Sequence, residues 1–117
     1  MRYLLLFPML LLCATLVGQS DQSQDASTEV VIDNDELKAI RYTSVPRGDV
    51  CGAGMHHHDP HMTVVLTDAK VRMTSEDGTS QEVEVAAGTS IWFEAETHSV
   101  INSGDGPTKM ILIFPKG

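Results

Sequence analysis

The chain has 117 residues and a formal net charge of −8, and no run of lysines or arginines occurs in it. A length of this order predicts a single domain. The acidic balance argues against nucleic acid and anionic membrane surfaces as partners, because both attract proteins through positive charge.

The first 18 residues are typical of a secretory signal peptide. Arg2 gives a positive start, and residues 3–17 are almost wholly apolar, in a run too short to predict a stable membrane span. We therefore expect an exported protein, periplasmic or secreted, that is cleaved near Gly18. Two alternatives remain open, a lipid anchor on Cys13 and an uncleaved apolar anchor.

Residues 19–34 are mostly polar and predict a flexible linker, within which residues 29–32 are a candidate edge strand. Residues 35–117 consist of short apolar or alternating runs separated by turns, a pattern typical of an all-β sandwich or small barrel. Asp77-Gly78 predicts a tight hairpin turn. The expected strands cover residues 37–45, 62–66, 71–74, 82–85, 90–93, 99–101 and 110–114.

Four of the five histidines fall within six residues, at His56, His57, His58 and His61. If a strand begins there, His56 and His58 point to one face and His57 to the other. The Cα atoms of His56 and His58 then lie about 6.6 Å apart, so that two imidazoles can converge on one ion. The alternative is a solvated histidine-rich loop. The position of His61 is ambiguous, because Pro60 interrupts regular pairing and can introduce a bulge.

A third ligand has to come from another strand, and His98 is the only histidine outside this group. The sequence therefore predicts a metal site formed by His56, His58 and His98. His61 and Glu96 are weaker candidates for catalytic proton transfer. The alternative for Glu96 is a solvated loop.

Removal of the signal peptide leaves Cys51 as the only cysteine, which excludes an intramolecular disulfide. The simplest interpretation of Cys51 is a small buried apolar residue. The alternative is a thiol near the metal, because Cys51 lies five residues before His56.

Residues 46–114 resemble the cupin family. The paired histidines of the first cupin motif match His56 and His58, Met62 falls in the position of the motif's glutamate, and Ala69 falls where a closing glycine is expected.

The second cupin motif supports the same resemblance. Its glycine, histidine and asparagine match Gly88, His98 and Asn102, whereas Glu94 and Glu96 stand where a Pro-x-Gly is expected.

The resemblance implies a double-stranded β-helix, or jelly-roll barrel, over residues 35–117. It also implies that His56, His58 and His98 bind a divalent ion (Fe, Zn, Ni, Mn or Cu) without a carboxylate ligand, and that Asn102 orients His98 from behind.

Three-histidine centres occur in cupin dioxygenases, so the expected function is metal-dependent oxidation of a small molecule. A non-catalytic module that binds a small ligand or a metal is the alternative. A homodimer formed through an exposed sheet edge is also expected.

Overall fold

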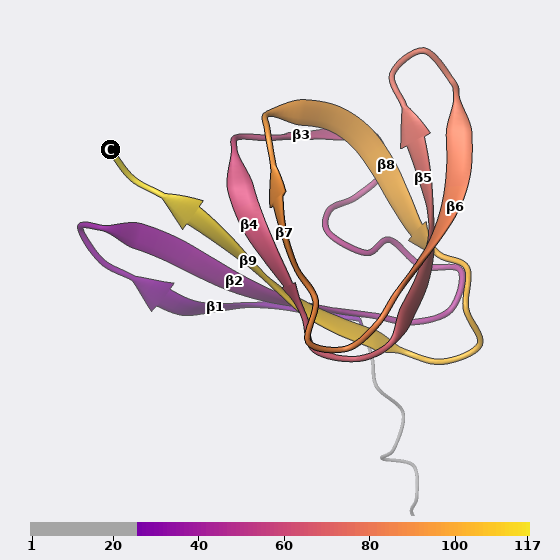
Figure 1. Cartoon of the computed structure of the whole chain (residues 1–117), viewed down its shortest axis with the longest axis horizontal. Helices are drawn as coiled ribbons and strands as arrows, with labels where there is room; N and C mark the ends of the chain where they lie inside the picture. The colour runs from indigo at the N-terminus through magenta and orange to yellow at the C-terminus, as the bar shows by residue number, and fades with distance from the viewer. Residues whose placement is uncertain (1–25) are drawn as a thin grey trace, which may run out of the picture.

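The computed structural model describes residues 26–117, which form nine strands and no helix within that range (Figure 1). The predictions for residues 1–25 therefore lie outside the described part of the chain. No helix that could span a membrane occurs among the described residues. The strands are β1 (Ser27–Asp33), β2 (Leu37–Ser44), β3 (His56–His58), β4 (His61–Val65), β5 (Ala69–Ser75), β6 (Ser80–Val85), β7 (Ser90–Phe93), β8 (Glu96–Asn102) and β9 (Thr108–Pro115).

These strands make two antiparallel sheets that enclose one core. The larger sheet has the order β1-β2-β9-β4-β7, and the smaller has the order β3-β8-β5-β6. Figure 1 shows the two sheets curving around a common interior, with β7 and β6 at their unpaired ends. The predicted all-β jelly-roll barrel is confirmed.

Alternation along each strand decides which side chains enter the core. On β4, His61, Thr63 and Val65 are buried, whereas Met62 and Val64 are only partly so. This is the two-residue repeat of a strand that has one face against the interior. The buried apolar cluster consists of Val50, Cys51, Val65, Ala69, Val71, Val100, Met110 and Leu112.

The hairpin that joins β5 to β6 forms at the predicted Asp77-Gly78 turn. Gly78 has φ 91°, a left-handed conformation that glycine adopts without steric cost. The Asp77 carboxylate accepts a hydrogen bond of 2.9 Å from the Thr79 backbone N–H. The turn aligns Val71 opposite Val83, so that both valines face the core.

The histidine-rich stretch is divided between the two sheets. His56–His58 pairs with β8 in the smaller sheet, whereas His61–Val65 pairs with β7 and β9 in the larger one. The chain crosses between the sheets at Asp59-Pro60, where proline has no N–H to continue a ladder. Pro60 therefore marks a change of sheet rather than the bulge considered from the sequence. As a result, His61 faces His58 across the interior, with 5.1 Å between the ring centroids.

Candidate metal centre

The pairing of β3 with β8 brings the three predicted ligands together. His56 lies directly opposite His98, and His58 lies opposite Glu96. The ring centroids are 4.6 Å apart for His56 and His58, 4.9 Å for His56 and His98, and 5.6 Å for His58 and His98.

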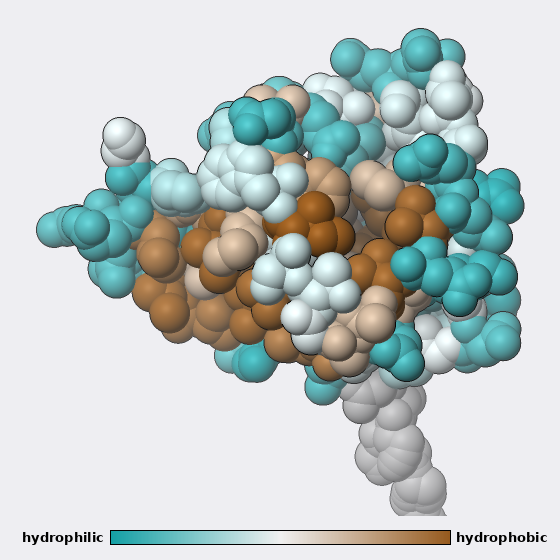
Figure 2. Space-filling model, in the orientation of Figure 1, coloured by the Kyte–Doolittle hydropathy of each residue, from teal (hydrophilic) through white to brown (hydrophobic). Residues whose placement is uncertain are grey.

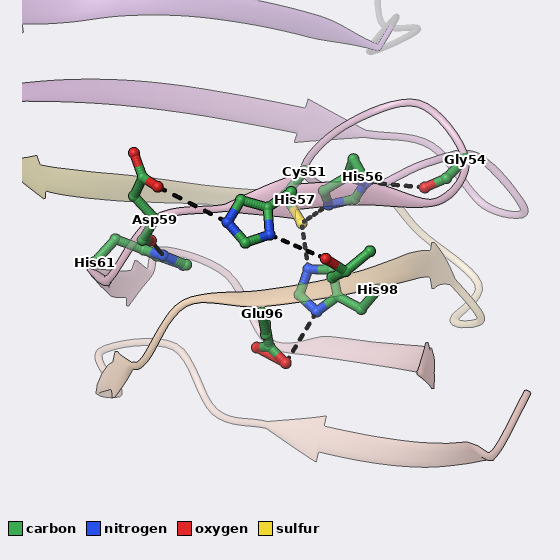
Figure 3. Close-up of polar contacts among 9 residues, drawn as sticks. Cys51, Gly54, His56, His57, Asp59, His61, Glu96 and His98 are labelled. Carbon is green, nitrogen blue, oxygen red and sulfur yellow. Dashed lines mark hydrogen bonds and ion pairs between the residues drawn. The ribbon is translucent and has the colours of Figure 1, made fainter. Parts of the chain in front are cut away.

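Cys51 completes this group. The Val50 backbone N–H donates to the Val100 carbonyl over 2.9 Å, which fixes Cys51 beside β8. The Cys51 Sγ lies 3.5 Å from His56 Nε2 and 3.9 Å from His98 Nε2, and Figure 3 shows these three side chains pointing toward one another.

The spacing of these donors fits one metal ion. One ligand atom from each of Cys51, His56, His58 and His98 lies within 4.8 Å of the others. Zinc–ligand bonds are about 2.0–2.3 Å long, which separates the ligand atoms of a tetrahedral site by about 3.5 Å. Small side-chain movements would therefore bring all four donors onto one ion. The sequence offered Cys51 only as a second interpretation, because its distance from His98 depends on the fold.

A glycine-rich loop sets the orientation of His56. Its Nδ1–H donates to the Gly54 carbonyl over 2.9 Å, which leaves Nε2 as the nitrogen that faces the other donors. Gly52 has φ 149°, and a Cβ at this position would lie 3.0 Å from the His56 ring. The loop can therefore lie against the imidazole only because residue 52 has no side chain.

Glu96 is the group next to His98. Its Oε2 lies 3.4 Å from His98 Nδ1, on the side of the ring away from Cys51 (Figure 3). A carboxylate in this position orients an imidazole and makes it a better ligand. Glu96, one of the two weaker candidates for proton transfer, is therefore placed to orient His98.

Asn102, for which the cupin resemblance implied this orienting role, lies at the other end of β8. Four residues of strand separate it from His98 by about 13 Å. Its side chain makes hydrogen bonds with the Gly106 carbonyl, the Gly104 N–H and the Ser44 hydroxyl rather than with His98. Asn102 organises the turn before β9.

Two buried imidazole nitrogens in this group, His58 Nε2 and His98 Nδ1, make no hydrogen bond among the described residues, although Glu96 Oε2 lies 3.4 Å from His98 Nδ1. An unsatisfied buried polar atom costs about 1–3 kcal/mol. A metal ion would satisfy His58 Nε2, so the donors present fit a metal.

The protonation states also suit a metal ligand set. Burial, and then the positive charge that neighbouring histidines can carry, lower the pKa of His58 to about 4, so this ring stays neutral. Burial also lowers the pKa of His98, against the opposing effect of Glu96. Burial raises the pKa of the Cys51 thiol to about 12, with smaller contributions from Glu96 and Asp49. A metal that binds the Cys51 thiolate must therefore displace a proton at neutral pH.

His57 lies on the opposite face of β3, as the alternation predicts. Its side chain is exposed, and its Nδ1 is 2.9 Å from the Thr97 hydroxyl. His57 is thus separate from the four donors.

Met62 does not occupy the place of a ligand. It is on the outward side of β4, whereas its neighbours His61 and Thr63 face the interior. A carboxylate at residue 62 would therefore point away from the histidines. Cys51, in the loop before β3, would supply the donor that becomes anionic if a metal binds.

His61, the other weak candidate, is 2% exposed and is not one of the four donors. Its ring lies between Phe93 and Phe114, at centroid distances of 5.4 and 5.0 Å.

A cavity of about 90 Å³ adjoins the donors inside the barrel. Cys51, His61 and His98 contribute to its wall, which is otherwise almost entirely apolar. The remaining lining residues are Val50, Thr63, Val65, Ala69, Val71, Met73, Val83, Val85, Ile91, Phe93, Val100, Met110 and Leu112.

The apolar lining continues to the surface between the two sheets. Val83 and Val85 on β6, and Ile91 and Phe93 on β7, line the cavity and are only half-buried. Figure 2 shows apolar surface between the places that β7 and β6 occupy in Figure 1. A small apolar molecule therefore has a route from this face toward Cys51 and His98.

Solved structures of the same fold come from several organisms. A cupin domain from Bordetella pertussis Tohama I aligns with 79% of this chain and 94% of its own, with a TM-score of 0.70 and 26% identity. An RmlC-like cupin with a double-stranded β-helix fold from Methanocaldococcus jannaschii aligns with 85% of this chain and 87% of its own, with a TM-score of 0.62 and 7% identity.

The polyketide cyclase RemF from Streptomyces resistomycificus is also similar. It aligns with 87% of this chain and 80% of its own, with a TM-score of 0.59 and 16% identity. No protein-family model and no curated protein matches the sequence. At 16% identity the likeness to the cyclase concerns the fold alone.

Proposed function

This chain belongs to the cupin superfamily, and we propose that it binds one transition-metal ion through His56, His58 and His98, with Cys51 as a fourth donor, and uses it to oxidise a small molecule. The observation that carries the proposal is the meeting of three imidazoles and a buried thiol beside an apolar cavity.

The donor set narrows the choice of ion. Thiolate and imidazole ligands suit iron, copper, zinc and nickel, whereas manganese prefers carboxylate and carbonyl oxygens. The inward face of β4 offers the centre no carboxylate, since it carries His61, Thr63 and Val65. We therefore expect manganese to bind more weakly than the other four ions.

A redox-active ion such as iron would supply the chemistry of dioxygen activation. In a dioxygenase reaction both atoms of O₂ enter the substrate, which also provides the electrons, so no outside reductant is needed. The protein's own contribution is to hold the ion with neutral imidazoles, to orient His98 through Glu96, and to keep water out with the apolar wall of the cavity.

A non-catalytic metal-binding module is the second candidate, and the number of donors favours it. Structural metal sites are closed by four protein ligands, whereas catalytic sites keep one position open. With Cys51, the four donors would complete the ligand set of a structural zinc site, whereas an ion that takes more ligands, such as iron, would keep positions for a substrate.

Metal analysis and oxygen uptake separate the two functions. We expect the exported protein, purified without a histidine tag, to hold about one ion per chain. The Fe(II) form should consume O₂ in the presence of a suitable small thiol or diketone, whereas the Zn(II) form should not. Stoichiometric metal without O₂ uptake across a broad substrate panel would favour the binding module. A protein that retains no ion would contradict both candidates.

We also propose that the protein is exported, on the basis of Arg2 and the apolar residues 3–17. The intact mass of the protein recovered from the periplasm or medium should place its N-terminus near residues 19–21. A retained Met1, or a diacylglycerol on Cys13, would contradict this expectation.

A further inference from the structure

His61 is a buried polar residue in the cavity for which metal binding provides no role. It comes from the larger sheet, opposite β3 and β8, and it is not among the four metal donors. Its ring nevertheless lines the same cavity as Cys51 and His98. An imidazole in a largely apolar cavity is expected to have a polar partner.

The surrounding residues determine which nitrogen of His61 can accept a hydrogen bond. Its Nδ1 lies 2.8 Å from the Asp59 carbonyl oxygen, which can only accept a hydrogen bond. Nδ1 therefore carries the hydrogen, and in the neutral ring Nε2 is left as an acceptor. Phe93 and Phe114 flank the ring at interplanar angles of 24° and 38°, which restricts its rotation. Nε2 is therefore the nitrogen of this ring that can accept a hydrogen bond from a molecule in the cavity that His61 lines.

The rest of the cavity wall limits what this acceptor could bind. Cys51 and His98 belong to the metal centre, and Thr63 is the only other lining residue with a polar side chain. The volume of about 90 Å³ is smaller than the cavity of about 150 Å³ that holds benzene in another protein. The part of a molecule that enters this cavity therefore has an apolar body smaller than benzene and few polar groups.

We propose that His61 Nε2 accepts a hydrogen bond from the substrate, and that the substrate is a small, largely apolar molecule with one hydroxyl, thiol or N–H donor near the metal. This inference rests on the proposed function, because it assigns the substrate class of the same site. His61 is then a residue that determines specificity. A site built around such an acceptor discriminates against an analogue without the donor, because the acceptor is left unpaired.

Pyrrole and furan are suitable probes, since these five-membered rings have nearly the same shape and only pyrrole carries an N–H donor. Both are titrated by NMR into the Zn(II)-loaded protein, in which the ion is redox-inert and binding occurs without turnover. We expect pyrrole to bind about tenfold to a hundredfold more tightly than furan, which is the effect of one unpaired buried acceptor.

Two variants assign this preference to one side chain. His61→Phe keeps an aromatic ring between Phe93 and Phe114 and should abolish the preference for pyrrole, while furan affinity and zinc content stay within about twofold. Thr63→Val removes the other polar group of the wall and should leave the preference intact. Equal affinity for the two probes in the wild type, or a preference that survives in His61→Phe, would overturn the inference.

A direct measurement covers the case in which His61→Phe does not fold. In the wild-type protein, the ¹⁵N chemical shift of His61 Nε2 should move when pyrrole is added and stay unchanged with furan. An unchanged shift with saturating pyrrole would overturn the inference. The zinc content of the same samples tests the proposed function separately. Samples that hold no zinc would contradict the metal centre, whereas the preference for pyrrole over furan could still be measured in them.

Discussion

The two ends of β8 carry buried polar clusters that differ in how fully their hydrogen bonds are made. At one end, Asn102 is 0% exposed and its amide is bonded to Ser44, Gly104 and Gly106. At the other end, His98 is 5% exposed and lies beside His58, whose buried Nε2 has no hydrogen-bond partner among the described residues. One strand thus joins a satisfied cluster to an unsatisfied one.

This difference separates a structural cluster from a binding site. A buried polar network whose members are all bonded stabilises one conformation. A cluster that leaves buried nitrogens without partners lowers stability unless a ligand supplies the missing bonds. Burial and polarity alone do not distinguish the two ends of β8; the four possible metal donors that lie close together at the His98 end do.

The largest expected effect comes from removing one imidazole of the unsatisfied cluster. His98→Ala should abolish stoichiometric metal, because only His56, His58 and Cys51 remain and Glu96 loses its partner. Elemental analysis and a competition titration with a chelator measure this. His57→Ala is the matched control and should keep nearly full affinity, since His57 lies on the other face of β3. Equal loss in both variants would mean that the cluster is only a histidine-rich loop.

The satisfied end of β8 should respond in the opposite way. Asn102→Ala leaves the Gly104 N–H and the Gly106 carbonyl without their bonds, and it should lower the free energy of unfolding by about 2–3 kcal/mol. Chemical denaturation of the metal-free protein measures this loss. Metal affinity, determined under conditions where the variant is folded, should change little. A large loss of metal affinity with normal stability would show that Asn102 acts on His98 after all.

Cys51→Ser tests the thiol as a donor. Mutation of residues that only orient metal ligands already costs about 10–100-fold in metal affinity, so loss of a ligand should lower zinc affinity by at least this much. Manganese affinity should fall less, because manganese prefers oxygen ligands to sulfur. Because burial raises the pKa of Cys51 to about 12, each zinc bound at pH 7–8 should release about one proton in the wild type and fewer in Cys51→Ser. Calorimetry in buffers of different ionisation enthalpy counts these protons. Equal proton release in the two proteins would exclude a bound thiolate.

A further effect concerns the metal-free protein at acid pH. The pKa of His58 is about 4 in the folded state, below its ordinary value of 6.5. Between these two values the unfolded chain binds a proton at His58 that the folded chain does not, so stability should fall as the pH drops from about 6.5 to about 4. Denaturation at several pH values measures this slope, and His58→Gln should make it shallower. An unchanged slope in that variant would exclude His58 as the cause.

Features set by neighbouring residues could be predicted from the sequence. The alternation of His56, His57 and His58 predicted which side chain lies outside the cluster, and Asp77-Gly78 predicted its hairpin. Each depends on strand alternation or turn geometry within a few residues.

Features that depend on how strands pack could not be predicted in the same way. The chain passes from one sheet to the other at Pro60. In the strand that follows, Thr63 rather than Met62 faces the interior. The position of Cys51 depends on the backbone bond between Val50 and Val100, residues far apart in the chain. A motif match could not reveal that Asn102 serves the turn before β9, because that depends on its partners.

X-ray absorption at the zinc edge tests the proposed centre most directly, since it identifies the atoms bound to the ion. We expect three imidazole nitrogens at about 2.0–2.1 Å and one sulfur at about 2.3 Å. The sulfur signal should disappear in Cys51→Ser. A spectrum of the wild-type protein with oxygen ligands, no sulfur and fewer than three imidazoles would contradict a metal centre built from Cys51, His56, His58 and His98.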